Sequence, residues 1–199
     1  MKSIFIIEDH PVMRNGLADY FIETDRWQVK GTASSIPEAK KLLSSVCADV
    51  ILLDIQLNDE GGCGLDIIPW FSNQNTTNPV FAVYSAFFDY AHVSSALSLG
   101  VQAYITKRRN QQELETILLE SALGKTYIDE KAQIKLKNVT DLFSLLTNRE
   151  SEILILVKNG LSNKKIAEEL GISRRTVENI LSCVYNKTGI NSRLDLQKL

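Results

Sequence analysis

The chain has 199 residues, of which 44% are hydrophobic and 23% charged, and its formal net charge at neutral pH is −2. This composition suits a globular protein with a buried core, and the length suits one large domain or two small ones. No apolar run approaches the ~20 residues that span a membrane, and acids interrupt the short apolar start MKSIFIIEDH too early for a signal peptide. We therefore expect a cytoplasmic protein without a membrane partner.

Charge is divided unevenly along the chain. Residues 1–123 carry 9 basic and 15 acidic side chains, whereas residues 124–140 (4 and 2) and 141–199 (9 and 7) each have a net charge of +2. An acidic front and a mildly basic back indicate two parts with different partners. The three cysteines, Cys47, Cys63 and Cys183, form no CxxC pair, so we expect reduced and buried thiols instead of a disulfide framework or a zinc site.

Short apolar runs alternate with helical patterns through the first 123 residues. The predicted strands are 3–7, 27–33, 50–53, 80–84 and 103–106, and the predicted helices are 12–22, 36–45, a helix that includes 65–71, 90–98 and 111–123. Strands of four to seven residues that alternate with helices are typical of βαβ units. We predict an α/β domain over residues 1–123, with a doubly wound, five-stranded parallel sheet.

The remainder of the chain has a different pattern. Gly124 ends the last helix of the first domain, and residues 124–140 are predicted to be a polar linker without a strong period. From residue 141 to 199 the pattern is helical, with predicted helices from the Thr147-x-x-Glu150 capping box to about residue 158, over 163–170, over 174–188, and after Ser192. The tight turn Leu170-Gly171-Ile172-Ser173 predicts a small all-α helix-turn-helix domain.

Polar side chains follow four of the predicted strands. Glu8 and Asp9 end the first strand, Asp54 the third, Ser85 the fourth and Lys107 the fifth. A single Asp at such a place is most often a turn former or a helix cap, but in a parallel sheet all of these strand ends meet at the edge where ligands bind. Carboxylates there suit Mg²⁺, and a lysine with a hydroxyl suits phosphoryl oxygens. Asp54 would be the nucleophile that forms an acyl phosphate.

Residues 1–123 resemble a response-regulator receiver domain in the stretches FIIEDHPVMRNGL, DVILLDIQL, VYSA and LGVQAYITK. The resemblance implies a flavodoxin-like strand order 2-1-3-4-5 and a sensor histidine kinase as phosphodonor. It makes Asp54 the phospho-acceptor. It also implies a Mg²⁺ site in which Asp9 binds directly, Glu8 binds largely through water, and Asp54 and the backbone carbonyl of Gln56 complete the protein ligands.

The same resemblance assigns the residues around the phosphoryl group. Ser85 and Lys107 would contact it, and Tyr104 would be the switch aromatic. Gln56 and Phe87 would flank the path of a hydrolytic water, which the ring of Phe87 should exclude. His10 is expected to be a residue of the helix start, without a phosphorelay role.

Two departures and one alternative accompany this interpretation. Asn58 begins the run NDEGGCG, where the family usually has a proline, which predicts a longer and looser loop, and Arg108 instead of proline follows Lys107. The alternative is an aspartyl phosphohydrolase, but those enzymes carry a second Asp two residues after the nucleophile, where this chain has Gln56. We therefore expect no enzyme beyond self-catalysed phosphoryl acceptance at Asp54.

The stretch LTNRESEILILVKNGLSNKKIAEELGISRRTVENILSCVYNKTGI resembles the LuxR-type helix-turn-helix of the NarL/FixJ subfamily. The resemblance makes residues 174–188 the recognition helix, lying in the major groove of double-stranded DNA. The hydroxyls and arginines suit phosphates, Asn179 suits adenine, and the lysines suit backbone neutralisation. The candidate DNA contacts are Lys164, Lys165, Ser173, Arg174, Arg175, Thr176, Glu178, Asn179, Ser182 and Lys187.

Glu178 occupies a position that is usually basic in this family. It either accepts a hydrogen bond from a cytosine amino group or pairs within its helix with Arg174 or Arg175, and we favour the intrahelical pair. Glu178 and the small basic excess also motivate the alternative of a protein-binding back domain. The sequence as a whole predicts a two-component response regulator that binds DNA, with a homodimer formed on phosphorylation or DNA binding.

Overall fold

The computed structural model of the protein describes residues 1–57, 63–74, 78–190 and 192–197. The chain divides into two units, residues 1–133 and 134–199. Within the described ranges, no helix has both the length and the apolar character needed to cross a membrane.

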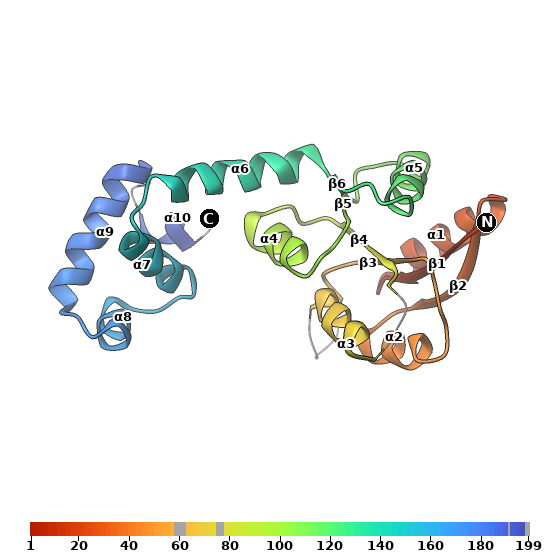
Figure 1. The fold of residues 1–199 in the computed structure, drawn as a ribbon, viewed down its shortest axis with the longest axis horizontal. Helices are drawn as coiled ribbons and strands as arrows, with labels where there is room; N and C mark the ends of the chain where they lie inside the picture. The colour runs from red at the N-terminus through yellow and green to blue at the C-terminus, as the bar shows by residue number, and fades with distance from the viewer. Residues whose placement is uncertain (58–62, 75–77, 191, 198–199) are drawn as a thin grey trace. The chain divides into compact units, whose positions relative to one another are not determined.

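The first unit contains a parallel sheet of six strands in the order β2-β1-β3-β4-β5-β6 (Figure 1). The strands are β1 (Lys2–Ile7), β2 (Trp27–Ala33), β3 (Val50–Leu53), β4 (Val80–Ser85), β5 (Ala103–Thr106) and β6 (Tyr127–Ile128). Every residue of β3 and β5 is buried, because helices cover both faces of the sheet. The predicted doubly wound parallel fold is confirmed.

Helices lie on both faces of this sheet (Figure 1). Helices α1 (Pro11–Glu23) and α5 (Gln111–Ser121) cover one face, where Phe21 and Leu118 pack in one cluster with Ile4 of β1. The other face carries α2 (Ile36–Leu43), α4 (Tyr90–Ser98) and α3 (Ile67–Gln74), which follows a 3-10 turn over Gly64–Asp66. There the rings of Phe71 in α3 and Phe81 in β4 meet edge to face, 5.8 Å apart.

The edge strand β6 is a difference from the predicted five-stranded sheet. Its backbone continues the ladder, since Tyr127 N donates to Gln102 O at 2.9 Å and Asp129 N donates to Tyr104 O at 2.9 Å. Residues 124–140, predicted to be a polar linker, contain β6 and much of helix α6 (Glu130–Ser144). A strand of two residues is too short to show a sequence period. In α6, the lysines between Ala132, Leu136 and Val139 make the helical spacing of these apolar residues difficult to recognise.

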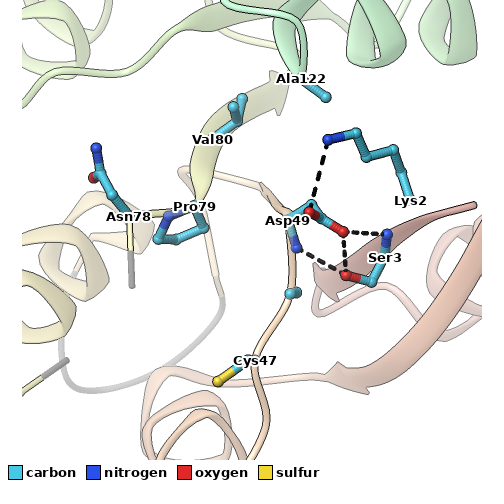
Figure 2. A pocket seen from close by; sticks show the side chains of 9 residues that line it. Lys2, Ser3, Cys47, Asp49, Asn78, Pro79, Val80 and Ala122 are labelled. Carbon is cyan, nitrogen blue, oxygen red and sulfur yellow. Dashed lines mark hydrogen bonds and ion pairs between the residues drawn. The ribbon is translucent and has the colours of Figure 1, made fainter. Parts of the chain in front are cut away.

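A hydrogen-bonded brace between Ser3 and Asp49 joins the amino ends of β1 and β3 beside a pocket of about 350 Å³ (Figure 2). The Asp49 carboxylate accepts from Ser3 N at 2.7 Å and from Ser3 Oγ at 2.6 Å, and Asp49 N donates to Ser3 Oγ at 2.9 Å. The hydrogen bond from the Ser3 hydroxyl lowers the pKa of Asp49. The Ser3–Asp49 brace fixes one end of two central strands whose other ends carry the candidate site.

The second unit is helical. It contains most of α6 (residues 134–144) and the helices α7 (Asn148–Lys158), α8 (Asn163–Leu170), α9 (Arg174–Thr188) and α10 (Arg193–Gln197). Thr147 and Glu150 form the predicted capping box, and Ser162 and Ser173 cap α8 and α9. Gly171 ends α8 with a left-handed φ of 63°, which allows the tight turn into α9. The helix-turn-helix prediction is confirmed.

The cysteines differ from their prediction. All three are free thiols, but Cys47 and Cys183 are exposed and Cys63 is half-buried. Cys47 lies in the connection between α2 and β3, and Cys183 lies on the outward side of α9, between the buried Leu181 and Val184. Their apolar character therefore did not decide their burial.

Candidate functional site

The carboxyl ends of β1, β3 and β5 bring Glu8, Asp54 and Lys107 into direct contact. Lys107 Nζ lies 2.7 Å from Glu8 Oε2 and 2.7 Å from Asp54 Oδ2. Glu8 is only 2% exposed and Asp54 only 7%, so the lysine compensates two buried carboxylates. Burial raises the pKa of Glu8 more than the hydrogen bond from Lys107 lowers it. Burial lowers the pKa of Lys107, but its hydrogen bonds to Asp54 and Glu8 outweigh this and raise it overall.

A cavity of about 260 Å³ opens beside this triad and is lined by Asp9, His10, Asp54, Gln56, Ala86, Phe87 and Lys107. Glu8, Asp9 and His10 offer ligand atoms that lie within 4.8 Å of one another. The site thus contains three carboxyl groups, those of Glu8, Asp9 and Asp54, and one ammonium group, that of Lys107. Most of its potential ligand atoms are oxygens. This donor set fits a hard divalent cation such as Mg²⁺. His10 itself is the N-cap residue of α1, as expected.

The chain returns to the acceptor strand at Gly64. Gly64 N donates to Ile55 O at 2.7 Å, and a Cβ added at this glycine would lie only 1.9 Å from the backbone oxygen of Asp54. Only glycine allows the two backbones to approach so closely. Asn58, which begins the predicted looser loop, lies outside the described residues.

Ser85 and Tyr104, the predicted switch residues, both contact the backbone of Phe87. Ser85 Oγ accepts from Phe87 N at 3.3 Å, and the Tyr104 hydroxyl donates to Phe87 O at 2.7 Å. Both side chains are fully buried, and burial raises the pKa of Tyr104. The structure therefore brings these residues together at the backbone of one residue, Phe87. Phe87 and Gln56 line the cavity as expected.

Asp129 is a buried acid near the site that the sequence analysis missed. Its Oδ2 accepts from Thr106 Oγ1 at 3.0 Å and from Arg109 Nε at 3.1 Å. Burial raises the pKa of Asp129, but these hydrogen bonds outweigh it and lower the pKa overall. Asp129 directly precedes α6, so the available signal was an Asp at a helix start.

The ten candidate DNA contacts of the second unit are all exposed. Ser173 is used as a cap, since Thr176 N donates to its Oγ at 3.0 Å. Arg174 Nε lies 2.8 Å from Glu178 Oε1, so the structure has the intrahelical pair that we favour. Lys187 is also engaged, because its Nζ lies 2.7 Å from Glu150 Oε2 in the capping box of α7.

Arg193 of α10 is a second residue that the sequence analysis missed. Its guanidinium donates to Asn163 Oδ1 at 2.7 Å and also to the backbone oxygen of Leu161. It thereby fastens the segment between α7 and α8, and with Lys164 and Arg174 it lines a basic pocket of about 340 Å³. The only sequence signal was an arginine directly after the predicted cap residue Ser192.

Comparisons with known proteins match both units. The family model for the response regulator receiver domain matches residues 4–119, and that for bacterial regulatory proteins of the luxR family matches residues 144–199. The chain is 29% identical over 206 residues to the oxygen regulatory protein NreC of Staphylococcus aureus, covering 98% of this chain and 94% of that protein. It is 28% identical over 200 residues to the DNA-binding transcriptional activator DevR/DosR of Mycobacterium tuberculosis, covering 97% and 91%.

The fold is similar to that of the solved RcsB response regulator of Salmonella typhimurium, with a TM-score of 0.75 at 21% identity over 99% of this chain and 98% of that chain. The likeness thus covers both units and not the receiver alone. With both family models matched in this order, the chain belongs to the response regulators of two-component systems, in the NarL/FixJ type that joins a receiver domain to a LuxR-type DNA-binding domain.

Proposed function

We propose that Asp54 accepts a phosphoryl group from a phosphohistidine of a sensor histidine kinase. The observation that carries this proposal is the placement of Lys107 Nζ 2.7 Å from both Asp54 and Glu8, beside an open cavity. An oxygen of Asp54 forms the new bond to phosphorus as the bond from phosphorus to the donor's imidazole nitrogen breaks and the imidazole leaves with the electron pair. Lys107 holds the carboxylate before transfer and contacts the phosphoryl oxygens after it.

Mg²⁺ is the cofactor that the donor set would hold, through Asp9, Asp54 and the Gln56 carbonyl directly and through Glu8 largely by way of water. When bound, the ion supplies the positive charge that offsets the carboxylates and the incoming phosphoryl oxygens. Ser85 contacts the phosphoryl group from the side of β4. Tyr104 then responds through Phe87, whose backbone N–H contacts Ser85 and whose backbone C=O contacts Tyr104.

We infer that the second unit regulates transcription by placing α9 in the major groove of double-stranded DNA. The ten exposed candidates supply the contacts, with Asn179 reading bases and the cations neutralising phosphates. Solved structures of RcsB include two of its dimers bound to two DNAs, which supports a homodimer here as well. Residues 1–123 would carry receiver function and 141–199 DNA binding, in the cytoplasm where the kinase domain and DNA are reached.

The test of phosphoryl acceptance uses the full chain with Mg²⁺ and acetyl phosphate. Intact-mass measurement should show one added phosphoryl group on the wild type and on the control Asp19→Ala, an exposed acid of α1, and none on Asp54→Ala. Undiminished labelling of Asp54→Ala would overturn the assignment.

The test of DNA binding is a gel shift on the DNA upstream of the protein's own gene at low and moderate salt. DNA affinity should fall steeply as salt rises, because binding to phosphates releases counterions. Absence of any salt-dependent complex would favour the protein-binding alternative.

A further inference from the structure

We propose that the first turn of α6 senses the state of the phosphorylation site through the ring of Phe88, with Lys131 as the positioning residue that reads it. The inference rests on the proposed function, because it needs a phosphoryl group on Asp54. It goes further by naming the contact through which that event reaches the helix leading out of the receiver. All of the residues involved lie within the first unit, residues 1–133.

Phe87 is restrained at both of its backbone polar groups. Its N–H is held by Ser85 Oγ at 3.3 Å and its carbonyl by the Tyr104 hydroxyl at 2.7 Å. When Ser85 Oγ turns toward a phosphoryl oxygen on Asp54, it moves away from this long hydrogen bond with Phe87 N. A change at the acceptor therefore alters the restraint on Phe87 and on the residue that follows it.

That following residue, Phe88, lies under two cations. Arg108 Cζ is 5.6 Å from the centroid of its ring, and Lys131 Nζ is 5.9 Å from it. Both distances are within the range of cation–π attraction. Arg108 directly follows Lys107, and Lys131 lies in the first turn of α6. The ring thus connects the phosphoryl-binding edge with the output helix.

Asp129 fixes the backbone from which Lys131 extends. Asp129 N donates to Tyr104 O at 2.9 Å, and Gln133 N donates to Asp129 O at 2.9 Å. The carboxylate is tied to Thr106 and Arg109. The start of α6 is therefore part of the sheet edge, and the Lys131 side chain extends toward the Phe88 ring from a backbone that this edge fixes.

The contact between Lys131 and Phe88 favours one of the two states of the receiver. The Lys131–Phe88 contact exists together with the hydrogen bond from Phe87 N to Ser85 Oγ, so it stabilises the arrangement in which Ser85 holds Phe87. When Ser85 turns to the phosphoryl group, the ring leaves Lys131 and the first turn of α6 loses a restraint. In a two-state equilibrium, weakening a contact that exists in one state shifts the population toward the other. Loss of the Lys131 cation should therefore mimic part of the activation.

The experiment measures the Kd of the full chain for DNA without and with beryllofluoride and Mg²⁺. The quantity compared between variants is the Kd without beryllofluoride divided by the Kd with it. Lys131→Gln should lower the Kd without beryllofluoride, so that the ratio falls by about two- to five-fold, the range of one exposed cation–π contact. Lys131→Arg, which keeps the cation, should retain the wild-type ratio. Lys135→Gln, an exposed lysine one turn further along α6, is the charge-matched control and should also retain it.

The outcomes separate this inference from the proposed function. If the wild type responds to beryllofluoride and Lys131→Gln responds equally, Phe88 and Lys131 do not couple the site to α6. A ratio that falls as much in Lys135→Gln overturns the inference too, since charge on the helix would then be the cause. If Lys131→Gln no longer accepts phosphoryl from acetyl phosphate, Lys131 acts on the acceptor itself and the coupling role is wrong. If the Kd of the wild type for DNA does not change with beryllofluoride, the proposed function is contradicted, and so is the inference that rests on it.

Discussion

Among the described residues beside the acceptor, Gly64 is one whose position leaves no room for a side chain. Because a Cβ there would lie 1.9 Å from the Asp54 backbone oxygen, Gly64→Ala should displace Asp54 and destabilise the protein by about 1–3 kcal/mol. We expect labelling by acetyl phosphate to be at least about ten-fold slower, since small displacements are costly in a positioned site. Gly16→Ala is the control, because nothing lies within 4 Å of its added Cβ and alanine favours a helix by roughly 0.5–1 kcal/mol. Equal effects of the two substitutions on labelling would contradict the prediction.

We predict that Phe87 sets the lifetime of the proposed phosphoryl group on Asp54. Its ring lines the cavity beside Asp54 and Gln56, where it occupies volume that a hydrolytic water needs. Gln56 would favour hydrolysis, because an amide can orient a water molecule, but it can do so only when a water molecule is already present. Phe87→Ala should therefore shorten the lifetime of the labelled protein by about ten-fold or more, measured as loss of label after removal of the donor. Leu99→Ala, an equally exposed apolar residue at the end of α4, should leave the lifetime unchanged; if Phe87→Ala does too, the ring is not the barrier.

Residues at strand ends were predictable, and residues that depend on a close approach were not. Glu8, Asp54, Ser85 and Lys107 follow apolar runs, so their convergence follows from the parallel sheet alone. Gly64 owes its role to a backbone contact that no local pattern records. The same holds for Asp129, whose partners Thr106 and Arg109 lie 23 and 20 residues away in sequence.

Helix α9, the proposed recognition helix, carries an internal ion pair that we predict lowers its DNA affinity. The Glu178 carboxylate lies 2.8 Å from the Arg174 guanidinium. It also adds negative charge to the face of α9 that we propose contacts DNA phosphates. Glu178→Gln should release Arg174, lower the Kd for DNA by roughly two- to ten-fold, and steepen the dependence of log K on log salt by about 1. Glu152→Gln, which breaks the Arg149 pair on α7, should do neither. Loss of affinity confined to one preferred sequence would instead identify Glu178 as a reader of cytosine.

Helices α7 and α9 are joined by Glu150 and Lys187. Hydrogen bonds from Lys187 and then from Thr147 N lower the pKa of Glu150 from 4.5 to about 2. Because the pKa is lower in the folded state, the stability that this carboxylate contributes is present above about pH 4.5 and is lost as the pH falls toward 2. Lys187→Ala should therefore lower the Tm at pH 7, with a deficit that narrows below pH 4.5. A deficit that stays constant over that range would show that the pair is not its cause; Lys164→Ala, an exposed lysine of α8, serves as control.

Elements with a period or a cap were predictable, and those made by tertiary pairing were not. The bounds of β3, β5, α8 and α9 agree with the prediction, because each has a continuous apolar run or a Ser cap and a Gly stop. Strand β6 exists only because Tyr127 and Ile128 meet the free edge of β5. Helix α6 is solvated on most of its surface, with Val139 and Ala132 as its buried side chains within residues 130–140, so its apolar spacing was too sparse to stand out.

The whole protein should change its association state on activation. We predict that phosphorylation of Asp54 draws Ser85 and Tyr104 into a new arrangement. This would change the surface around α4, β5 and α5 and so shift the monomer–dimer equilibrium. Light scattering and small-angle X-ray scattering should show a larger mass with beryllofluoride than without it, at matched concentrations. Asp54→Ala should show no difference. Identical mass and shape at every concentration would exclude this switch.

The sixth strand also determines where this chain can be cut and joined. Removal of the residues after 123 would strip β6 and Asp129 from β5, a strand buried at all four residues, and would leave its N–H and C=O groups as an open edge. Open apolar edges template pairing with other chains. Chimeras that graft this receiver onto a foreign output domain should therefore keep residues 1–133 together, and a receiver ended at 123 should aggregate where one ended at 133 stays monodisperse.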